Sequence, residues 1–110
     1  MATLPAGNPI KCVITQKCEA NPQVSLLVLK VRNQIQWKAA PPSSSYTLKL
    51  PGGYFEGHPN DFDLVITGNV FLPVIPLVAI KACRIGPYIY DSSGTTCATI
   101  AEPPEIIIGS

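Results

Sequence analysis

The chain has 110 residues, of which 46% are apolar and only 14% are charged, and its formal net charge is +1. This length favours a single domain over residues 1–110. The abundance of apolar residues at almost zero net charge excludes intrinsic disorder. Eight basic residues against seven acidic ones, with no basic cluster, argue against nucleic-acid binding through phosphates.

Proline determines the predicted fold class. The chain contains 12 prolines, and each one removes a backbone donor and clashes inside a helix. Only residues 23–40 form a long window without proline, and this window alternates in polarity instead of following a helical period. No long helix fits, so the sequence predicts an all-β fold.

The first predicted strands lie before residue 40. Residues 11–18 alternate in polarity and form the first of them. Residues 27–38 show the clearest pattern, with apolar side chains on one face and polar ones on the other. We expect one strand here, bent near Asn33. Residues 39–45, with the sequence AAPPSSS, are a predicted loop.

The middle of the chain alternates strands with turns. Residues 46–50 alternate again and stop at residues 51–53, Pro-Gly-Gly. Residues 54–61 combine Gly, Pro, Asn and Asp without a period and are predicted to be a long loop. Residues 63–67 are a short predicted strand that ends at the Gly68-Asn69 turn.

The last part of the chain supplies the remaining strands, which we expect over residues 70–72, 77–84, 88–90, 95–100 and 105–109. The segment 73–76 contains two prolines and is predicted to be an edge or crossing segment. Residues 106–108 are all isoleucine, which suits a strand covered on both faces and would be an aggregation hazard at an edge. We therefore predict that the last strand lies inside a sheet.

The sequence predicts no membrane span and shows no signal peptide. Residues 64–80 carry no charge, but Pro73 and Pro76 interrupt them, and a spanning helix would leave freed carbonyls in lipid. Residues 1–5 lack a basic segment and an apolar core. We expect a cytoplasmic protein if the chain is complete, and an exported one if Met1 replaces a removed leader.

Three segments carry a resemblance to a known family. They are the Ile35-Gln36-Trp37 strand, the Tyr-x-Leu-x-Leu-Pro-Gly strand end at residues 46–52, and a closing Tyr-x-Tyr-Asp that is followed by Pro-Glu-Ile-Ile-Ile-Gly. Together, residues 25–109 resemble small cupredoxin-like sandwiches, particularly metal-free bacterial ones. The resemblance implies a two-sheet Greek-key sandwich of about seven to eight strands with mixed sheets. It implies no function.

A blue-copper site cannot be assembled from this chain. Such a site uses two histidines, one cysteine and a weak axial methionine. The chain has one histidine, His58, and one methionine, Met1, and its last turn at residues 91–94 holds no ligand. We expect no metal and no other cofactor.

The four cysteines, Cys12, Cys18, Cys83 and Cys97, allow three disulfide pairings. Along one continuous strand, Cys12 and Cys18 would lie roughly 20 Å apart, too far for a bond that needs Cα atoms within about 7 Å. A Cys83–Cys97 pair fits poorly across the predicted hairpin, so crossed bonds from the first strand fit better. Four buried thiols, one or two disulfides, and a metal site stay open, although no standard zinc spacing is present.

His58 is the one histidine that could act as a catalytic base. It would need an orienting partner, such as Asp61 or Asp63, and a nucleophile, such as a cysteine or one of the serines 43–45. No nucleophile-elbow or cysteine-protease motif accompanies these residues. We expect a solvated loop histidine.

The sequence therefore predicts a non-catalytic binding or structural module. Its loops at 39–45 and 54–61 are expected to act together at one end, with Tyr54, Phe55 and His58 as a candidate binding loop. The alternative for Tyr54 and Phe55 is that they close the end of the core. Low charge favours a protein partner or self-association through an apolar face. Two other functions stay open: a metal- or thiol-dependent protein that uses His58 with cysteines, and an exported disulfide-bonded domain.

Overall fold

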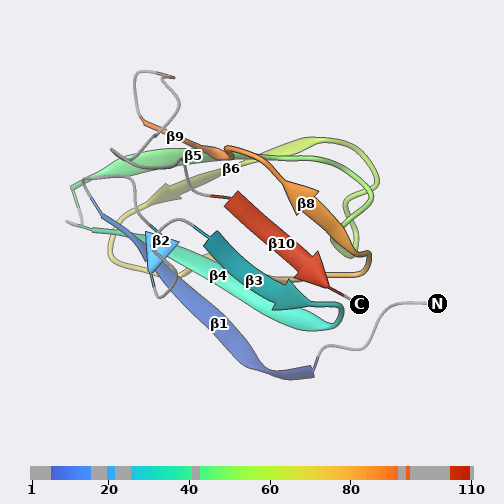
Figure 1. The fold of residues 1–110 in the computed structure, drawn as a ribbon. Coiled ribbons are helices and arrows are strands. Elements are labelled where there is room, and N and C mark those ends of the chain that lie inside the picture. The colour runs from blue at the N-terminus through green and yellow to red at the C-terminus, as the bar shows by residue number, and fades with distance from the viewer. Residues whose placement is uncertain are drawn as a thin grey trace.

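The computed structural model of the protein describes residues 6–15, 20–21, 26–40, 43–91, 94 and 105–109, and these contain strands and no helix. The all-β prediction is therefore confirmed. The strands (Figure 1) are β1 (Ala6–Ile14), β2 (Ala20–Asn21), β3 (Leu26–Lys30), β4 (Asn33–Ala39), β5 (Ser45–Leu50), β6 (Phe62–Thr67), β7 (Leu72–Val78), β8 (Cys83–Ile85), β9 (Ile89–Tyr90) and β10 (Glu105–Gly109). The strand predicted over 95–100 lies outside the described residues.

The described strands form three small sheets, with the orders β2-β1-β4-β7, β3-β10-β8 and β6-β5-β9. The pairs β1–β4 and β3–β10 are parallel, and the other pairs are antiparallel. Two sheets were expected. One break between sheets lies at Gly86-Pro87: before it β8 pairs with β10, and after it β9 pairs with β5.

The last strand occupies the predicted place. β10 lies between β3 and β8, with Ile106 opposite Leu27 on one side and Ile85 on the other. Ile106 and Ile108 are buried, whereas Ile107 between them is only half-buried. This alternation places Ile106 and Ile108 in the core. The position of β10 between two other strands confirms the prediction.

The single bent strand predicted over 27–38 is wrong. The chain turns at Val31 and Arg32, and β3 and β4 belong to different sheets. Arg32 has a φ of 83°, the side chain of Asn33 accepts a hydrogen bond from the Lys30 backbone N–H at 2.8 Å, and the Val31 N–H donates to the Gly109 carbonyl at 2.8 Å. These bonds stabilise a turn. The sequence predicted only a bend near Asn33, because the apolar alternation resumes after it with the same parity.

The other predicted strands are confirmed only in part. Of the strand predicted over 11–18, residues 11–14 belong to β1 and residues 16–18 lie outside the described residues. β5 and β6 lie where strands were expected, and the loop over 54–61 contains no helical turn. The prolines of 73–76 lie in β7, an edge strand of its sheet. The strand expected over 77–84 is split, because β7 ends at Val78 and β8 begins at Cys83. Val70 precedes β7 and lies in a bend.

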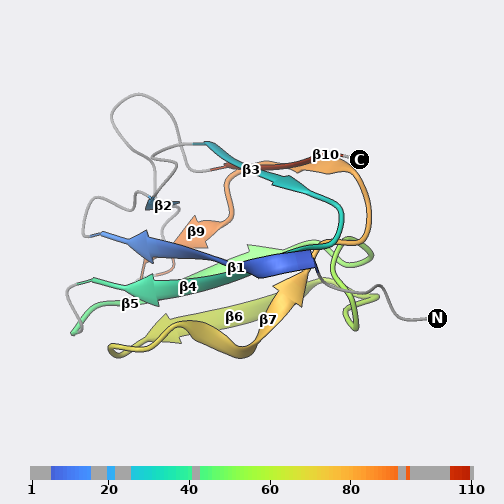
Figure 2. The same cartoon turned by 90° about the horizontal axis from the view of Figure 1, so that it is seen from below.

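The core lies between the sheets, and Figures 1 and 2 show β3 and β10 covering β1 and β4. Its largest fully buried side chains are Trp37, Tyr88 and Phe55. The rings of Trp37 and Tyr88 meet edge to face, with centroids 6.1 Å apart. The Trp37 Nε1–H donates to the Tyr88 hydroxyl at 3.3 Å, so the one polar group of each ring has a partner inside the core.

We expect the substitution Tyr88→Phe to lower the free energy of unfolding by about 1–3 kcal/mol, because it leaves the buried Trp37 N–H without its acceptor. Urea denaturation of the variant measures this loss. Tyr54→Phe is the matched control, since Tyr54 is half-buried. A smaller loss for Tyr88→Phe than for Tyr54→Phe would contradict the buried bond.

Candidate functional site

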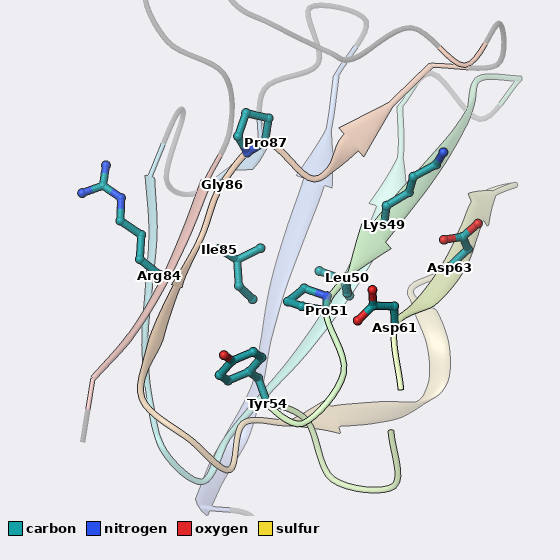
Figure 3. Close-up of a pocket in the computed structure, with 10 residues that line it drawn as sticks. All are labelled: Lys49, Leu50, Pro51, Tyr54, Asp61, Asp63, Arg84, Ile85, Gly86 and Pro87. Atoms are coloured by element: carbon teal, nitrogen blue, oxygen red, sulfur yellow. The ribbon is translucent and has the colours of Figure 1, made fainter. Parts of the chain in front are cut away.

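A surface pocket of about 520 Å³ opens where the end of β5, the start of β6 and β8 come together. β5 and β6 share one sheet and β8 belongs to another, so the pocket lies between two sheets. Figure 3 shows the side chains around it. The lining residues are Lys49, Leu50, Pro51, Tyr54, Asp61, Asp63, Arg84, Ile85, Gly86 and Pro87.

The floor of the pocket is apolar. Leu50 and Ile85 belong to the buried core, with 2% and 5% of their surfaces exposed. Pro51 and Pro87 and the half-buried ring of Tyr54 add further apolar surface. A side chain that enters the pocket past the charged rim would therefore contact hydrocarbon at the floor.

Two carboxylates lie on one side of the pocket, as Figure 3 shows for Asp61 and Asp63. Asp61 Oδ1 accepts a hydrogen bond from the Gly52 N–H at 2.9 Å, which ties the loop after β5 to the start of β6. Asp63 is exposed and lies opposite Lys49 in the β5–β6 register. Neither carboxylate lies within ion-pair distance of a cation in the described part of the chain.

The two cationic side chains of the lining interact outside the pocket. Arg84 Nη2 lies 2.7 Å from Glu105 Oε1, and Arg84 Nε donates to the same oxygen at 3.2 Å. Lys49 Nζ lies 4.8 Å from the centre of the Tyr90 ring. Figure 3 shows the Arg84 side chain directed away from the two aspartates.

The predicted binding loop divides between the pocket and the core. Tyr54 lines the pocket. Phe55 is fully buried and bridges to Ala79, which agrees with the alternative that it closes the core. The His58 ring stacks on Phe62 with centroids 3.9 Å apart and does not line the pocket.

The two predicted loops do not share one end of the molecule. β5 runs from Ser45, opposite Thr67, to Leu50, opposite Phe62. The loop over 39–45 therefore precedes one end of β5, and the loop over 54–61 follows the other. At about 3.3 Å per residue, Ser45 lies about 16 Å from the end of β5 that leads to the His58 loop, so Ser45 is too distant to pair with that histidine.

Cys12 and Cys83 form no disulfide with a described residue, and Cys18 and Cys97 lie outside the described residues. Cys12 is fully buried, and burial raises the pKa of its thiol to about 12. Burial also raises the pKa of Cys83, an effect that the nearby Lys81 charge partly offsets. The part of the chain that the structure describes contains no group of three His, Cys, Asp or Glu side chains that could hold a metal ion. The predicted disulfides and the use of His58 with cysteines stay predictions.

We expect iodoacetamide at pH 8 to alkylate Cys83 well before Cys12 in the folded protein. The thiolate is the reactive species, and both burial and the raised pKa suppress it at Cys12. Mass mapping of the cysteine peptides against time measures the two rates, and the urea-unfolded protein is the control in which they should converge. Equal rates in the folded protein would contradict the burial of Cys12.

The sequence predicted Asp61 and Asp63 only as orienting partners for His58, and it gave no role to Lys49 or Arg84, the other charged residues of the pocket. It identified Tyr54 through its loop but did not group it with Lys49 or Arg84. The signal for Lys49 and Asp63 is their shared position in the β5–β6 register, which a single sequence does not reveal. Arg84 joins them only because β8 packs beside β5 at the pocket.

No helix among the described residues is long and apolar enough to cross a membrane. Comparisons with protein-family models, with curated proteins and with solved structures gave no match for this chain.

Proposed function

We propose that the protein is a non-catalytic binding domain whose pocket receives a basic side chain of a protein partner. The observation that carries this proposal is the pair of pocket carboxylates, Asp61 and Asp63, beside an apolar floor and without an ion-paired cation among the described residues. Binding surfaces of opposite charge favour specific association.

The shape of a lysine or arginine side chain matches this arrangement. Its aliphatic stem can lie along apolar surface while its charged end reaches a polar rim. Here the stem would contact Ile85 and the Tyr54 ring, and the cation would meet Asp63. Arg84 is already paired with Glu105, so it opposes an incoming cation less than a free guanidinium would.

The composition of the pocket supports binding over nucleophilic catalysis. Its described lining residues include no serine, threonine, cysteine or histidine, the side chains that most often serve as activated nucleophiles or their bases. The aspartates are positioned at the rim, where they can attract and orient a cation.

We also infer that the chain folds as one domain with a cupredoxin-like, two-sheet Greek-key arrangement. The parallel pairs β1–β4 and β3–β10 support the mixed sheets that the cupredoxin resemblance implies. The burial of alternate residues in β4, β5 and β10 supports strands with one face toward a shared core.

The binding proposal is tested with two small probes, N-acetyl-lysine methylamide and N-acetyl-glutamate methylamide. We expect the lysine probe to cause saturable amide shifts at Lys49, Tyr54 and Ile85 in the NMR spectrum of the full chain. Asp63→Asn should weaken this binding about two- to fivefold, as removal of an exposed ion pair does. Asp63 is preferred to Asp61 because Asp61 also holds the Gly52 N–H.

The matched control is Glu56→Gln, which changes a described carboxylate outside the pocket and should leave the affinity unchanged. Saturable shifts with the glutamate probe and none with the lysine probe would contradict the proposal. So would equal lysine affinity in Asp63→Asn and the unaltered chain.

A further inference from the structure

The edge strand β7 bulges out of its sheet. In the pairing with β4, Ile35 lies opposite Leu77 and Trp37 lies opposite Leu72. A single β4 residue, Gln36, therefore faces the whole segment 73–76. The Gln36 Nε2 group donates to the carbonyl of Pro73 at 3.0 Å, and this bond holds the bulge in place. Figure 2 shows β7 strongly bent along the margin of the molecule opposite β3 and β10.

The bulge presents two aliphatic side chains to solvent. Val74 is 81% exposed and Ile75 is 83% exposed, whereas Leu77 in the same strand is 4% exposed. These two residues are the most exposed large apolar side chains in the described part of the chain. Pro73 and Pro76 flank them and lack backbone donors, so this edge is unsuited to accepting another β-strand.

Two lysines lie on the same face as the bulge. Lys11 of β1 is the register partner of Gln36, and Lys38 follows Gln36 by two residues in β4. Lys11 Nζ and Lys38 Nζ lie 5.2 Å and 4.9 Å from the centre of the Phe71 ring. Neither lysine forms an ion pair with a described carboxylate. We call Lys11, Lys38, Phe71, Val74 and Ile75 the basic–apolar face.

We propose that the basic–apolar face docks on the surface of an anionic lipid bilayer. Val74 and Ile75 would enter the boundary between headgroups and acyl chains, and Lys11 and Lys38 would meet the anionic headgroups. Peripheral binding of this kind combines buried apolar area with attraction between basic side chains and anionic lipids. The cations and the apolar tip of this face supply both parts.

The chemistry of the face favours a lipid surface over a protein. Valine is under-represented among the residues that dominate protein interfaces, where Trp, Tyr and Arg prevail, and a protruding tip suits a soft, deformable surface. A second copy docked face to face would bring Lys11 and Lys38 of both chains together, which costs like-charge repulsion. An anionic bilayer complements both lysines at once.

Co-sedimentation of the full chain with vesicles tests the proposal. We expect binding to vesicles of phosphatidylcholine with roughly one-third phosphatidylserine, little binding to pure phosphatidylcholine, and weakening by salt. Lys11→Gln and Lys38→Gln should each reduce the partition coefficient about fivefold. The double variant V74S/I75S should lose most of the binding to anionic vesicles.

The matched control is Val65→Ser, which removes an apolar side chain of 59% exposure on β6 and should leave vesicle binding unchanged. Asp63→Asn should also bind vesicles normally. A failure of the lipid proposal can therefore be distinguished from a failure of the pocket proposal. Absence of binding to anionic vesicles would overturn the lipid proposal. Concentration-dependent dimerisation that V74S/I75S abolishes, without vesicle binding, would assign the face to a second copy and overturn it as well.

Discussion

Replacing Ile106 by alanine should lower the free energy of unfolding by about 2–5 kcal/mol, the usual cost of emptying a fully buried aliphatic site. Ile106 has no exposed surface and occupies the middle strand of its sheet, between Leu27 of β3 and Ile85 of β8. The side chains around it are held by strands on both sides, so the cavity has little freedom to collapse. Urea denaturation with an unchanged m-value would measure the loss.

The neighbouring residue supplies the control. Ile107 has the same side chain and the same strand but is half-buried and points to the other face, so Ile107→Ala should cost about 1 kcal/mol or less. A shift of β10 by one residue would exchange the two faces. Equal losses for the two variants, or a larger loss for Ile107→Ala, would therefore contradict the register of β10 with β3 and β8.

The position of β10 could be predicted because its sequence restricts where it can lie. Three consecutive isoleucines leave no polar face for solvent, so only a covered strand accommodates them. The edge position of β7 could be predicted for the complementary reason. Pro73 and Pro76 have no backbone N–H to donate to a neighbouring strand, and an edge strand tolerates that loss because one of its sides is unpaired. In both cases the residues of one segment are enough to restrict its place in a sheet.

The division between β3 and β4 could not be predicted. Asn33 is the one polar residue in the apolar series of alternate residues from 27 to 37, and it indicated only a bend, because the series resumes after it with the same parity. Leu27 and Leu29 before the turn have the same parity as Ile35 and Trp37 after it, and all four are buried. The turn has an arginine at positive φ, where glycine is usual. Its stability comes from bonds to distant segments, such as that from the Val31 N–H to Gly109. Tertiary contacts therefore decided this boundary.

The candidate site, like the fold, could be predicted only in part. Its loop could be recognised from composition, and Tyr54 from its aromatic and polar character. Two features needed the fold: which of the adjacent aromatics Tyr54 and Phe55 enters the core, and which charges from other strands come near. Parity has no meaning in a loop, and the pairing of Lys49 with Asp63 depends on a register that many alternating strands could satisfy.

Replacing Gly52 by alanine should destabilise the protein by about 3 kcal/mol, the upper part of the usual range for overpacking. A Cβ at this position would lie 2.2 Å from the backbone carbonyl carbon of Asn60 and 2.6 Å from the Pro59 oxygen. Backbone atoms cannot rotate aside as a side chain does, so the loop must move as a unit. That movement would stretch the bond from the Gly52 N–H to Asp61 and disturb the pocket.

The adjacent Gly53 separates the steric effect from the loss of glycine itself. Its added Cβ would meet open space, but its φ is +90°, so Gly53→Ala should cost only the backbone strain of about 1–2 kcal/mol. We expect Gly52→Ala to lower stability more, to shift the amide resonances of residues 59–61, and to weaken binding of the lysine probe. A larger loss of stability in Gly53→Ala would mean that conformational strain, and not the close approach to Asn60, makes this turn depend on glycine. Because Asp61 lines the pocket and accepts the Gly52 bond, the same close approach links the stability of the loop to the geometry of the site.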